Sequence, residues 1–339
     1  RAAALRLRAS LLLIGALAHR APRLRLPYTG GCKLGRRSVL AHRYALEPLG
    51  VRITTAADAY VVERRRALRG AELTMYESGD TPTENLLLAA VLADGRTTVH
   101  LASANYMVQD LAYLLRAMGA QIEGIGTTTL TVDGVRRLHG ATHAIMPDPI
   151  EAMLWLSLAA TTRSALTIQR CPIEFLRLEL LKLQKMGLKV RILRTYPSAS
   201  GVFTLADLAT KPSRLRALED KIYARPFPGL NIDNLPFFVP VATQAAGATL
   251  IHDWVYENRA IYYLELAKLG ANLHLIDQHR VLVSGPTPLE PAEVVCPPAL
   301  RPATILVIGM LAAKGKSILR HTYSIDRGYA NLSGRLRAL

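Results

Sequence analysis

The chain has 339 residues, of which half are hydrophobic and a fifth are charged, and this composition excludes an intrinsically disordered protein. Its formal net charge of +16 favours anionic partners, such as phosphorylated metabolites, nucleic acid or acidic lipid, without choosing among them. At this length we expect two domains rather than one.

The spread of basic and apolar residues narrows the class of protein further. The arginines and lysines form no basic tail and no patch interleaved with aromatic residues, so we expect no nucleic-acid binding. No apolar run approaches the roughly 18 residues that a membrane span needs, so none is expected. Cys32, Cys171 and Cys296 are odd in number and widely spaced, which predicts neither a disulfide framework nor a metal site. This cysteine usage fits a cytoplasmic protein best.

The first predicted element is a helix from about Leu5 to His19. Arg6 and Arg8 precede an apolar run that ends at Ala16–Ala18, a pattern that resembles a signal peptide with its cleavage site. The same residues also begin a helix well, and we prefer the helix.

Residues 27–37 form the next element, a predicted loop with three glycines, one proline and no apolar periodicity. Cys32 lies in its middle, and Lys33, Arg36 and Arg37 are cations that favour a reactive thiolate. The glycines let the backbone approach a ligand and present its amides to an anion. The residues alone leave two interpretations equally open. The loop could bind an anion and carry a reactive cysteine, or it could be a basic surface loop with an unreactive cysteine.

A repeat of about seventy residues organises the rest of the chain. Each copy contains an amphipathic helix, a glycine in the position of a C-cap and then an alternating strand. Earlier in a copy, a helix end of small residues precedes a strand, as in residues 93–99, 246–250 and 313–318. Such units stack on one another, and the alternation argues against an all-helical solenoid. The C-cap glycines are Gly50, Gly119, Gly187 and Gly270, which lie 69, 68 and 83 residues apart.

The prolines of residues 146–151 mark the predicted domain boundary, just before an apolar helix at 152–160. We therefore expect domains at 1–147 and 148–339. The chain holds just under five copies of the repeat, and residues 334–339 resemble the start of a fifth helix. If two equal halves need whole units, about one unit is missing from the first domain.

Six short patterns occur in order and together resemble one family. With the repeat, they make the sequence similar to the enolpyruvyl transferases from Arg8 to the last residue. Within that family, the cysteine loop favours the branch that acts on UDP-N-acetylglucosamine over the branch that acts on shikimate 3-phosphate. The patterns are Arg8-Ala9-Ser10, Gly30-Gly31-Cys32 with Arg37, Asp233 after a Pro-Gly segment, Tyr256-Glu257-Asn258-Arg259, Leu300-Arg301 and Ile325-Asp326-Arg327-Gly328-Tyr329.

The resemblance implies an α/β fold of two inside-out α/β barrel domains, each built from βαβαββ units and closing over a cleft. It also implies transfer of the enolpyruvyl group from phosphoenolpyruvate to the 3′-hydroxyl of UDP-N-acetylglucosamine, with release of phosphate. This is the first committed step of peptidoglycan synthesis, and it would tie the protein to cell-wall biogenesis, cell shape and cell division. No cofactor is implied.

The match of motifs assigns roles to individual residues. Cys32 would be the general acid at C3 of phosphoenolpyruvate, and Asp233 the base for the sugar hydroxyl. Arginines bind carboxylate and phosphate groups bidentately, so four of them would hold phosphoenolpyruvate. Considered singly, each arginine could instead be a solvated surface residue, Asp233 a turn residue and His42 a structural histidine. The phosphoenolpyruvate arginines are Arg8, Arg37, Arg301 and Arg327, and the other substrate-binding residues are His42, Asn258, Arg259 and Leu300.

The departures from the family pattern concentrate on the nucleotide side. Ser38-Val39-Leu40 replaces Pro-Val-Asp, residues 79–83 replace Ser-Val-Gly-Ala-Thr, and Asn105-Tyr106-Met107 replaces an acidic stretch. The family's Lys-Asn pair has no counterpart. Two alternatives therefore stay open, namely enolpyruvyl transfer to another phosphorylated or nucleotide-bound alcohol, and a non-catalytic paralogue that binds the ligand. For residues 1–339 alone we expect weak or absent activity.

Overall fold

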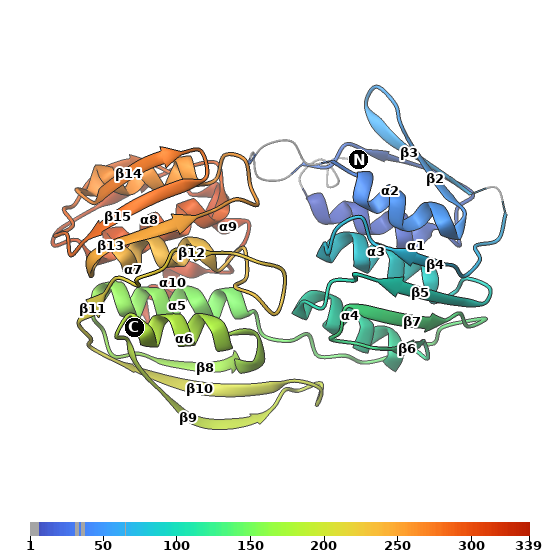
Figure 1. Cartoon of the computed structure of the whole chain (residues 1–339), viewed down its shortest axis with the longest axis horizontal. Coiled ribbons are helices and arrows are strands. Elements are labelled where there is room, and N and C mark those ends of the chain that lie inside the picture. The colour runs from blue at the N-terminus through green and yellow to red at the C-terminus, as the bar shows by residue number, and fades with distance from the viewer. Residues whose placement is uncertain (1–6, 31–33, 35–37, 65) are drawn as a thin grey trace. The chain divides into compact units, whose positions relative to one another are not determined.

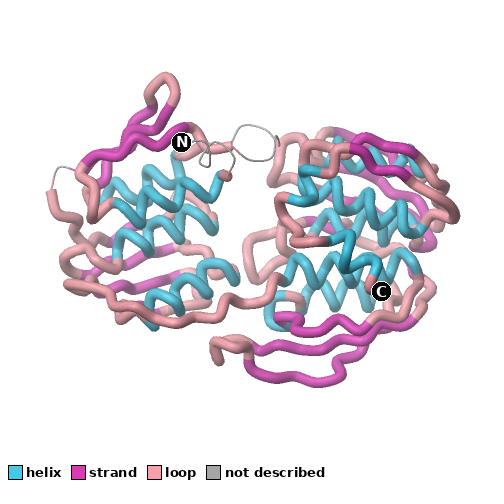
Figure 2. The backbone as a smooth tube through the Cα atoms, turned by 180° about the vertical axis from the view of Figure 1, so that it is seen from behind, coloured by secondary structure: helices cyan, strands magenta, loops and turns pink. Residues whose placement is uncertain are grey.

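The structure is a computed structural model that describes residues 7–30, 34, 38–64 and 66–339. Contacts between Cα atoms divide the chain into two compact units, the first mainly residues up to Ile145 and the second mainly residues from Met146. Within each unit, the helices lie on the inside and the sheets on the outside (Figures 1 and 2). The assignment of 1–147 and 148–339 as two barrel domains stays a prediction.

The first unit surrounds helix α3 (Asp80–Ala90), which packs against α1, α2 and α4. A three-stranded antiparallel sheet in the order β1-β3-β2 and a four-stranded sheet in the order β4-β5-β7-β6 flank these helices (Figure 1). The remaining elements are η1 (Arg8–Leu12), α1 (Leu13–Leu17), β1 (Arg23–Pro27), α2 (Leu40–Leu46), η2 (Glu47–Leu49), β2 (Val51–Thr55), β3 (Ala59–Arg64), β4 (Glu72–Thr74), β5 (Arg96–His100), α4 (Tyr106–Ala117), β6 (Gln121–Glu123) and β7 (Thr129–Asp133).

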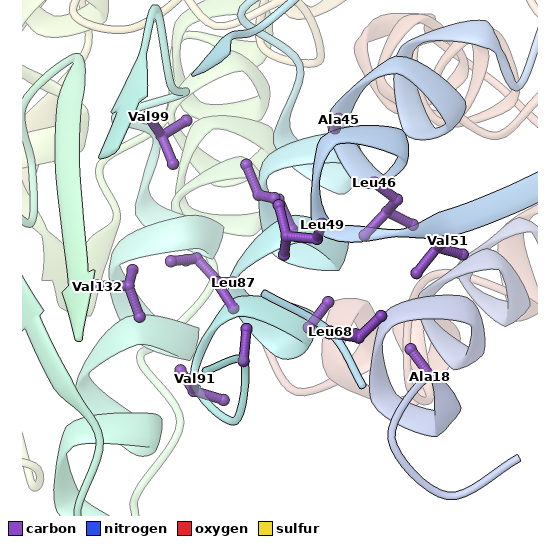
Figure 3. Packing of buried hydrophobic residues seen from close by; sticks show 14 of the residues in the cluster. Ala18, Ala45, Leu46, Leu49, Val51, Leu68, Leu87, Val91, Val99 and Val132 are labelled. Carbon is purple, nitrogen blue, oxygen red and sulfur yellow. The ribbon is translucent and has the colours of Figure 1, made fainter. Parts of the chain in front are cut away.

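The core of the first unit forms where α3 meets its neighbours. Leu87 of α3 is fully buried together with Leu46 of α2 and Val99 of β5, and Figure 3 shows these side chains in one apolar cluster. Eight of the eleven residues of α3 are buried, as is typical of a helix enclosed on most sides.

The second unit is built around α5 (Pro149–Thr162) and α8 (Leu300–Ala312), which contact each other and α7 (Phe238–Thr243). Its sheets have the orders β8-β10-β9, β11-β13-β15-β14 with β12 beside β13, and β16-β17. The remaining elements are β8 (Thr167–Pro172), η3 (Ile173–Phe175), α6 (Arg177–Lys185), β9 (Lys189–Pro197), β10 (Thr204–Lys211), β11 (Leu215–Arg216), β12 (Ile222–Tyr223), η4 (Leu235–Phe237), β13 (Ala245–His252), η5 (Ala260–Leu269), β14 (Asn272–Asp277), β15 (Arg280–Gly285), β16 (Glu293–Val295), β17 (Ile318–Arg320), α9 (Tyr323–Asp326) and α10 (Leu332–Arg337).

The predicted repeat is confirmed at each of its four glycines. Gly50, Gly119, Gly187 and Gly270 have φ angles of 102°, 98°, 103° and 81°. This left-handed conformation suits glycine because it has no Cβ, and it ends the preceding helix. A strand follows directly in each copy, namely β2, β6, β9 and β14.

Three predicted elements need correction. The helix before Gly270 is a 3-10 helix, η5, and residues 246–250 lie within strand β13 rather than at a helix end. The first helix begins as a 3-10 turn, η1, and its α-helical part ends at Leu17. Within the residues described, every helix is too short or too polar to cross a membrane.

Candidate active site

Arg259 is the centre of a buried charge cluster in the second unit. It directly precedes η5, and its side chain is only 1% exposed. Its Nε donates a hydrogen bond to Asp253 Oδ2 at 2.6 Å, and its Nη2 donates to Asp253 Oδ1 at 2.8 Å. This bidentate pairing fixes the plane of the guanidinium group and compensates its charge in a site without water contact.

The same guanidinium group holds the segment that carries Asp233. Its Nη1 donates to Asp233 Oδ1 at 3.2 Å, and its Nη2 donates to the carbonyl oxygen of Ile232 at 2.6 Å. The Asp233 side chain is 30% exposed, so a ligand can reach it although its partner Arg259 is buried. A carboxylate in this setting can accept a hydrogen bond or a proton from a bound hydroxyl group.

Glu179 of α6 braces the Asp233 segment from the other direction. Its Oε1 accepts hydrogen bonds from the backbone N–H of Asn231 at 3.2 Å and from Asn234 Nδ2 at 2.8 Å. Burial raises the pKa of Glu179, and the hydrogen bond from Asn234 opposes that shift. The two residues that flank Ile232 and Asp233 are therefore fixed, which limits how far the carboxylate can move.

Arg301 supplies a second cation beside Asp233. It lies in the first turn of α8, and its Nη2 is 3.8 Å from Asp233 Oδ2. Its Nη1 donates to the hydroxyl oxygen of Tyr329 at 2.7 Å. Burial raises the pKa of Tyr329. Asp233 is thus flanked by two guanidinium groups, each oriented by a further side chain.

The Asp-Arg-Gly-Tyr stretch packs against the start of α8 through Leu300. A Cβ added at Gly328 would lie 2.3 Å from Leu300 Cδ2, so any larger residue there would require the Leu300 side chain to move. Arg327 precedes Gly328 at the end of α9 and is half-buried, and Tyr329 follows as the partner of Arg301. Asn258 is exposed in the turn that leads to Arg259.

Arg8 and His42 belong to the first unit. Arg8 Nη2 donates to the carbonyl oxygen of Ser38 at 3.1 Å. His42 is 2% exposed, and its Nδ1 accepts a hydrogen bond from Asn85 Nδ2 at 2.8 Å, which places the ring proton on Nε2, near Thr81. Burial, with a smaller effect of Arg8, lowers the pKa of His42 to about 4. This geometry favours the structural alternative for His42 over a nucleotide contact.

Asn85 links three helical segments around His42. Its Oδ1 accepts from the backbone N–H of Gly15 at 2.8 Å, and its Nδ2 donates to the carbonyl oxygen of Leu11 at 2.9 Å as well as to His42. A Cβ at Gly15 would lie 2.2 Å from the carbonyl oxygen of Asn85, so the approach of α1 to α3 depends on glycine there.

Cys32 and Arg37, predicted as general acid and anion ligand, lie outside the described residues. The other two cysteines are buried, and burial raises the pKa of Cys171 to about 12 and that of Cys296 to about 11. Both therefore hold their protons at neutral pH and are poor nucleophiles. In the described part of the chain, no group of three or more histidine, cysteine, aspartate or glutamate side chains is placed to hold a metal ion.

Three supporting residues escaped the sequence analysis, namely Asp253, Glu179 and Tyr263, whose hydroxyl donates a hydrogen bond to Asp253 Oδ2. Asp253 follows the last residue of β13, and Tyr263 lies four residues after Arg259, a spacing that could have suggested a contact on one helix face. Glu179 is separated from Asn234 by 55 residues, and no local pattern joins them.

Comparison with known proteins defines the class. A family model described as EPSP synthase (3-phosphoshikimate 1-carboxyvinyltransferase) matches residues 1–336. The chain therefore belongs to the EPSP synthase family, the enolpyruvyl transferases, as the resemblance predicted.

Curated relatives point to one branch of this family. The chain is 37% identical to a UDP-N-acetylglucosamine 1-carboxyvinyltransferase of Koribacter versatilis over 98% of the chain and 73% of the relative. It is 36% identical to the protein of that name from Treponema pallidum, over 99% of the chain and 78% of the relative. The predicted resemblance to the UDP-N-acetylglucosamine branch is confirmed.

Solved structures show the same fold. The enolpyruvyl transferase NikO from Streptomyces tendae superposes with a TM-score of 0.79 at 25% identity, over 96% of this chain and 75% of that chain. EPSP synthase from Acinetobacter baumannii superposes with a TM-score of 0.72 at 19% identity, over 95% of this chain and 75% of that chain. The predicted enolpyruvyl transferase fold is confirmed, and the sheets of the described residues are open rather than closed.

Proposed function

We propose that this protein transfers the enolpyruvyl group of phosphoenolpyruvate to the 3′-hydroxyl of UDP-N-acetylglucosamine and releases phosphate. The observation that carries this proposal is the partly exposed Asp233 carboxylate, flanked by Arg259 at 3.2 Å and Arg301 at 3.8 Å. The names of its curated relatives support this acceptor. We further propose that the reaction serves peptidoglycan synthesis, and hence cell shape and division, in the cytoplasm.

The proposed reaction begins with addition across the enol double bond. Asp233 takes the proton of the 3′-hydroxyl as its oxygen forms a bond to C2 of phosphoenolpyruvate, and Cys32 gives a proton to C3. The resulting tetrahedral intermediate then returns a proton from C3 to the Cys32 thiolate and releases phosphate from C2, which takes up the proton held by Asp233; this restores the double bond as an enolpyruvyl ether and both residues to their starting states. Atoms and charge balance without a redox cofactor.

The arginines would supply the electrostatic part of this reaction. Phosphoenolpyruvate carries a carboxylate and a phosphate, and guanidinium groups bind both bidentately. Arg301 is already oriented by Tyr329, so it could meet charge that moves onto the leaving phosphate without reorganising. Arg8, Arg37 and Arg327 are proposed as further ligands of phosphoenolpyruvate, and Asn258 and Leu300 as contacts of the acceptor.

The test is phosphate release by the purified chain given phosphoenolpyruvate and UDP-N-acetylglucosamine. We expect slow release that needs both substrates and that falls about 10²-fold in Asp233→Asn, the usual cost of removing a general base. Asp220→Asn, which changes an exposed aspartate in the same unit, is the matched control and should leave the rate unchanged.

The same assay separates the alternatives. The changed residues at 38–40 favour a different acceptor as the second candidate, and release with another phosphorylated alcohol but not with UDP-N-acetylglucosamine would establish it. Calorimetric binding of both substrates without release would indicate a non-catalytic paralogue. Binding of neither substrate would contradict every form of the proposal.

A further inference from the structure

A continuous chain of hydrogen bonds leads from the core of the second unit to Asp233. The hydroxyl of Tyr263 donates to Asp253 Oδ2, Asp253 accepts two hydrogen bonds from Arg259, and Arg259 also donates to Asp233. Tyr263 and Asp253 are fully buried, and of these four residues only Asp233, the last in the series of hydrogen bonds, is partly exposed. We propose that Tyr263 and Asp253 are positioning residues that fix Arg259 and, through it, the orientation and charge environment of Asp233.

The geometry explains how orientation passes along this chain. Asp253 engages the Nε and Nη2 edge of the guanidinium group, and the ring of Tyr256 lies against it with 4.5 Å between Cζ and the ring centroid. Because Asp253 occupies one edge of the guanidinium group and Tyr256 covers one of its faces, the direction of Nη1 towards Asp233 is fixed. Tyr263 in turn restricts Asp253, because its hydroxyl bonds the same oxygen that accepts from Arg259 Nε.

The charges explain why a second carboxylate is needed. Burial opposes the charge of Arg259, but its neighbours, above all the bonded Asp253 carboxylate, outweigh it and the pKa of Arg259 is raised, so the guanidinium group stays protonated. Burial raises the pKa of Tyr263 well above its ordinary value, so its hydroxyl remains a donor. Because Asp253 compensates Arg259, Asp233 is not the sole counter-ion of a buried cation and remains available to accept a proton.

This inference rests on the proposed function for its kinetic test, which uses Tyr263→Phe in the full chain. The substitution removes one hydroxyl without changing the ring, and Tyr262→Phe makes the same change at the neighbouring, half-buried tyrosine. We expect kcat of Tyr263→Phe to fall about tenfold, as when one hydrogen bond to a charged group is lost, with the KM for phosphoenolpyruvate unchanged. Tyr262→Phe should keep the wild-type kcat.

A double-substitution cycle separates positioning from a merely structural role. If Tyr263 acts through Asp233, adding Tyr263→Phe to Asp233→Asn should lower the residual rate no further. An equal tenfold loss in both backgrounds would overturn the proposal, and so would an unchanged kcat in Tyr263→Phe.

A second readout does not need turnover. The Nε–H of Arg259 is buried and bonded to Asp253, so in ¹⁵N-arginine-labelled protein it should give a slowly exchanging signal, identified by its loss in Arg259→Lys. Tyr263→Phe should shift this signal and speed its exchange, whereas Tyr262→Phe should not. An unaltered signal in Tyr263→Phe would refute the positioning role. A wild-type protein without turnover would refute the proposed function instead.

Discussion

A buried carboxyl group in the first unit should make the stability of that unit depend on pH in an unusual way. Glu84 of α3 is 8% exposed, and burial, with a smaller effect of Asp80, raises its pKa to about 7. His42 of α2 is also buried, and its pKa is lowered to about 4. The replacement Glu84→Gln keeps the shape and polarity of the protonated carboxyl but cannot ionise.

The two groups change the free energy of unfolding in opposite directions over overlapping pH ranges. For Glu84 the folded pKa lies above the unfolded value of 4.5. The contribution of Glu84 to the stability of the folded state is therefore greatest below pH 4.5 and is lost as the pH rises from about 4.5 to 7. For His42 the folded pKa lies below the unfolded value of 6.5, so stability is lost as pH falls from about 6.5 to 4. Each difference corresponds to about 3 kcal/mol, and the two effects nearly cancel between pH 4.5 and 6.5.

Glu84→Gln should therefore be about 3 kcal/mol more stable than the wild type at pH 8 and equally stable at pH 4.5. Urea unfolding followed by circular dichroism measures this difference. Trp155 and Trp254 both belong to the second unit, so a transition without a change in tryptophan fluorescence reports the first unit. The control Glu77→Gln alters an exposed glutamate next to α3. A Glu84→Gln protein no more stable than the wild type at pH 8 would refute the reasoning.

Three further outcomes are expected. Gly15→Ala should destabilise the first unit by about 2–3 kcal/mol, because its Cβ would collide with the backbone of Asn85, and an unchanged urea midpoint would show that α1 can move away. Glu179→Ala should lower the free energy of unfolding by about 1–3 kcal/mol for each donor left unpaired, and it should lower kcat because the Asp233 segment becomes less rigid. A wild-type kcat in this variant would show that Glu179 does not position Asp233. Fosfomycin, an epoxide, should modify Cys32 alone, since the other two cysteines hold their protons. Mass spectrometry should find one adduct at Cys32, and Cys32→Ser should abolish it.

The regular part of the fold could be predicted from the sequence because its signals are local. A helix pattern, a glycine such as Gly119 and an alternating strand follow one another within about twenty residues, and the structure has them in that order. The 3-10 form of η5 was not predictable in the same way. Its apolar spacing resembles that of an α-helix, and the difference lies in backbone hydrogen bonds rather than in side-chain pattern.

The candidate site was predictable only where short motifs carry it. Asp233, Arg259 and Arg301 each lie on a motif, and in the structure Asp233 forms ion pairs with both arginines, at 3.2 Å and 3.8 Å. Asp253 and Glu179 lie on no motif. Asp253 meets Arg259 across a turn of the chain, whereas only tertiary packing brings Glu179 to the residues on either side of Asp233. His42 shows the reverse case, since the sequence left its role open and its burial against Asn85 favours a structural one.

The most direct test of the central claim is to identify the product. Proton NMR of the purified chain incubated with phosphoenolpyruvate and UDP-N-acetylglucosamine should show the two vinyl protons of an enolpyruvyl ether on the 3′-oxygen. They should appear together with one phosphate per ether, and Asp233→Asn should nearly abolish both signals. Phosphate without the ether, or an ether that forms at the same rate in Asp233→Asn, would contradict the account.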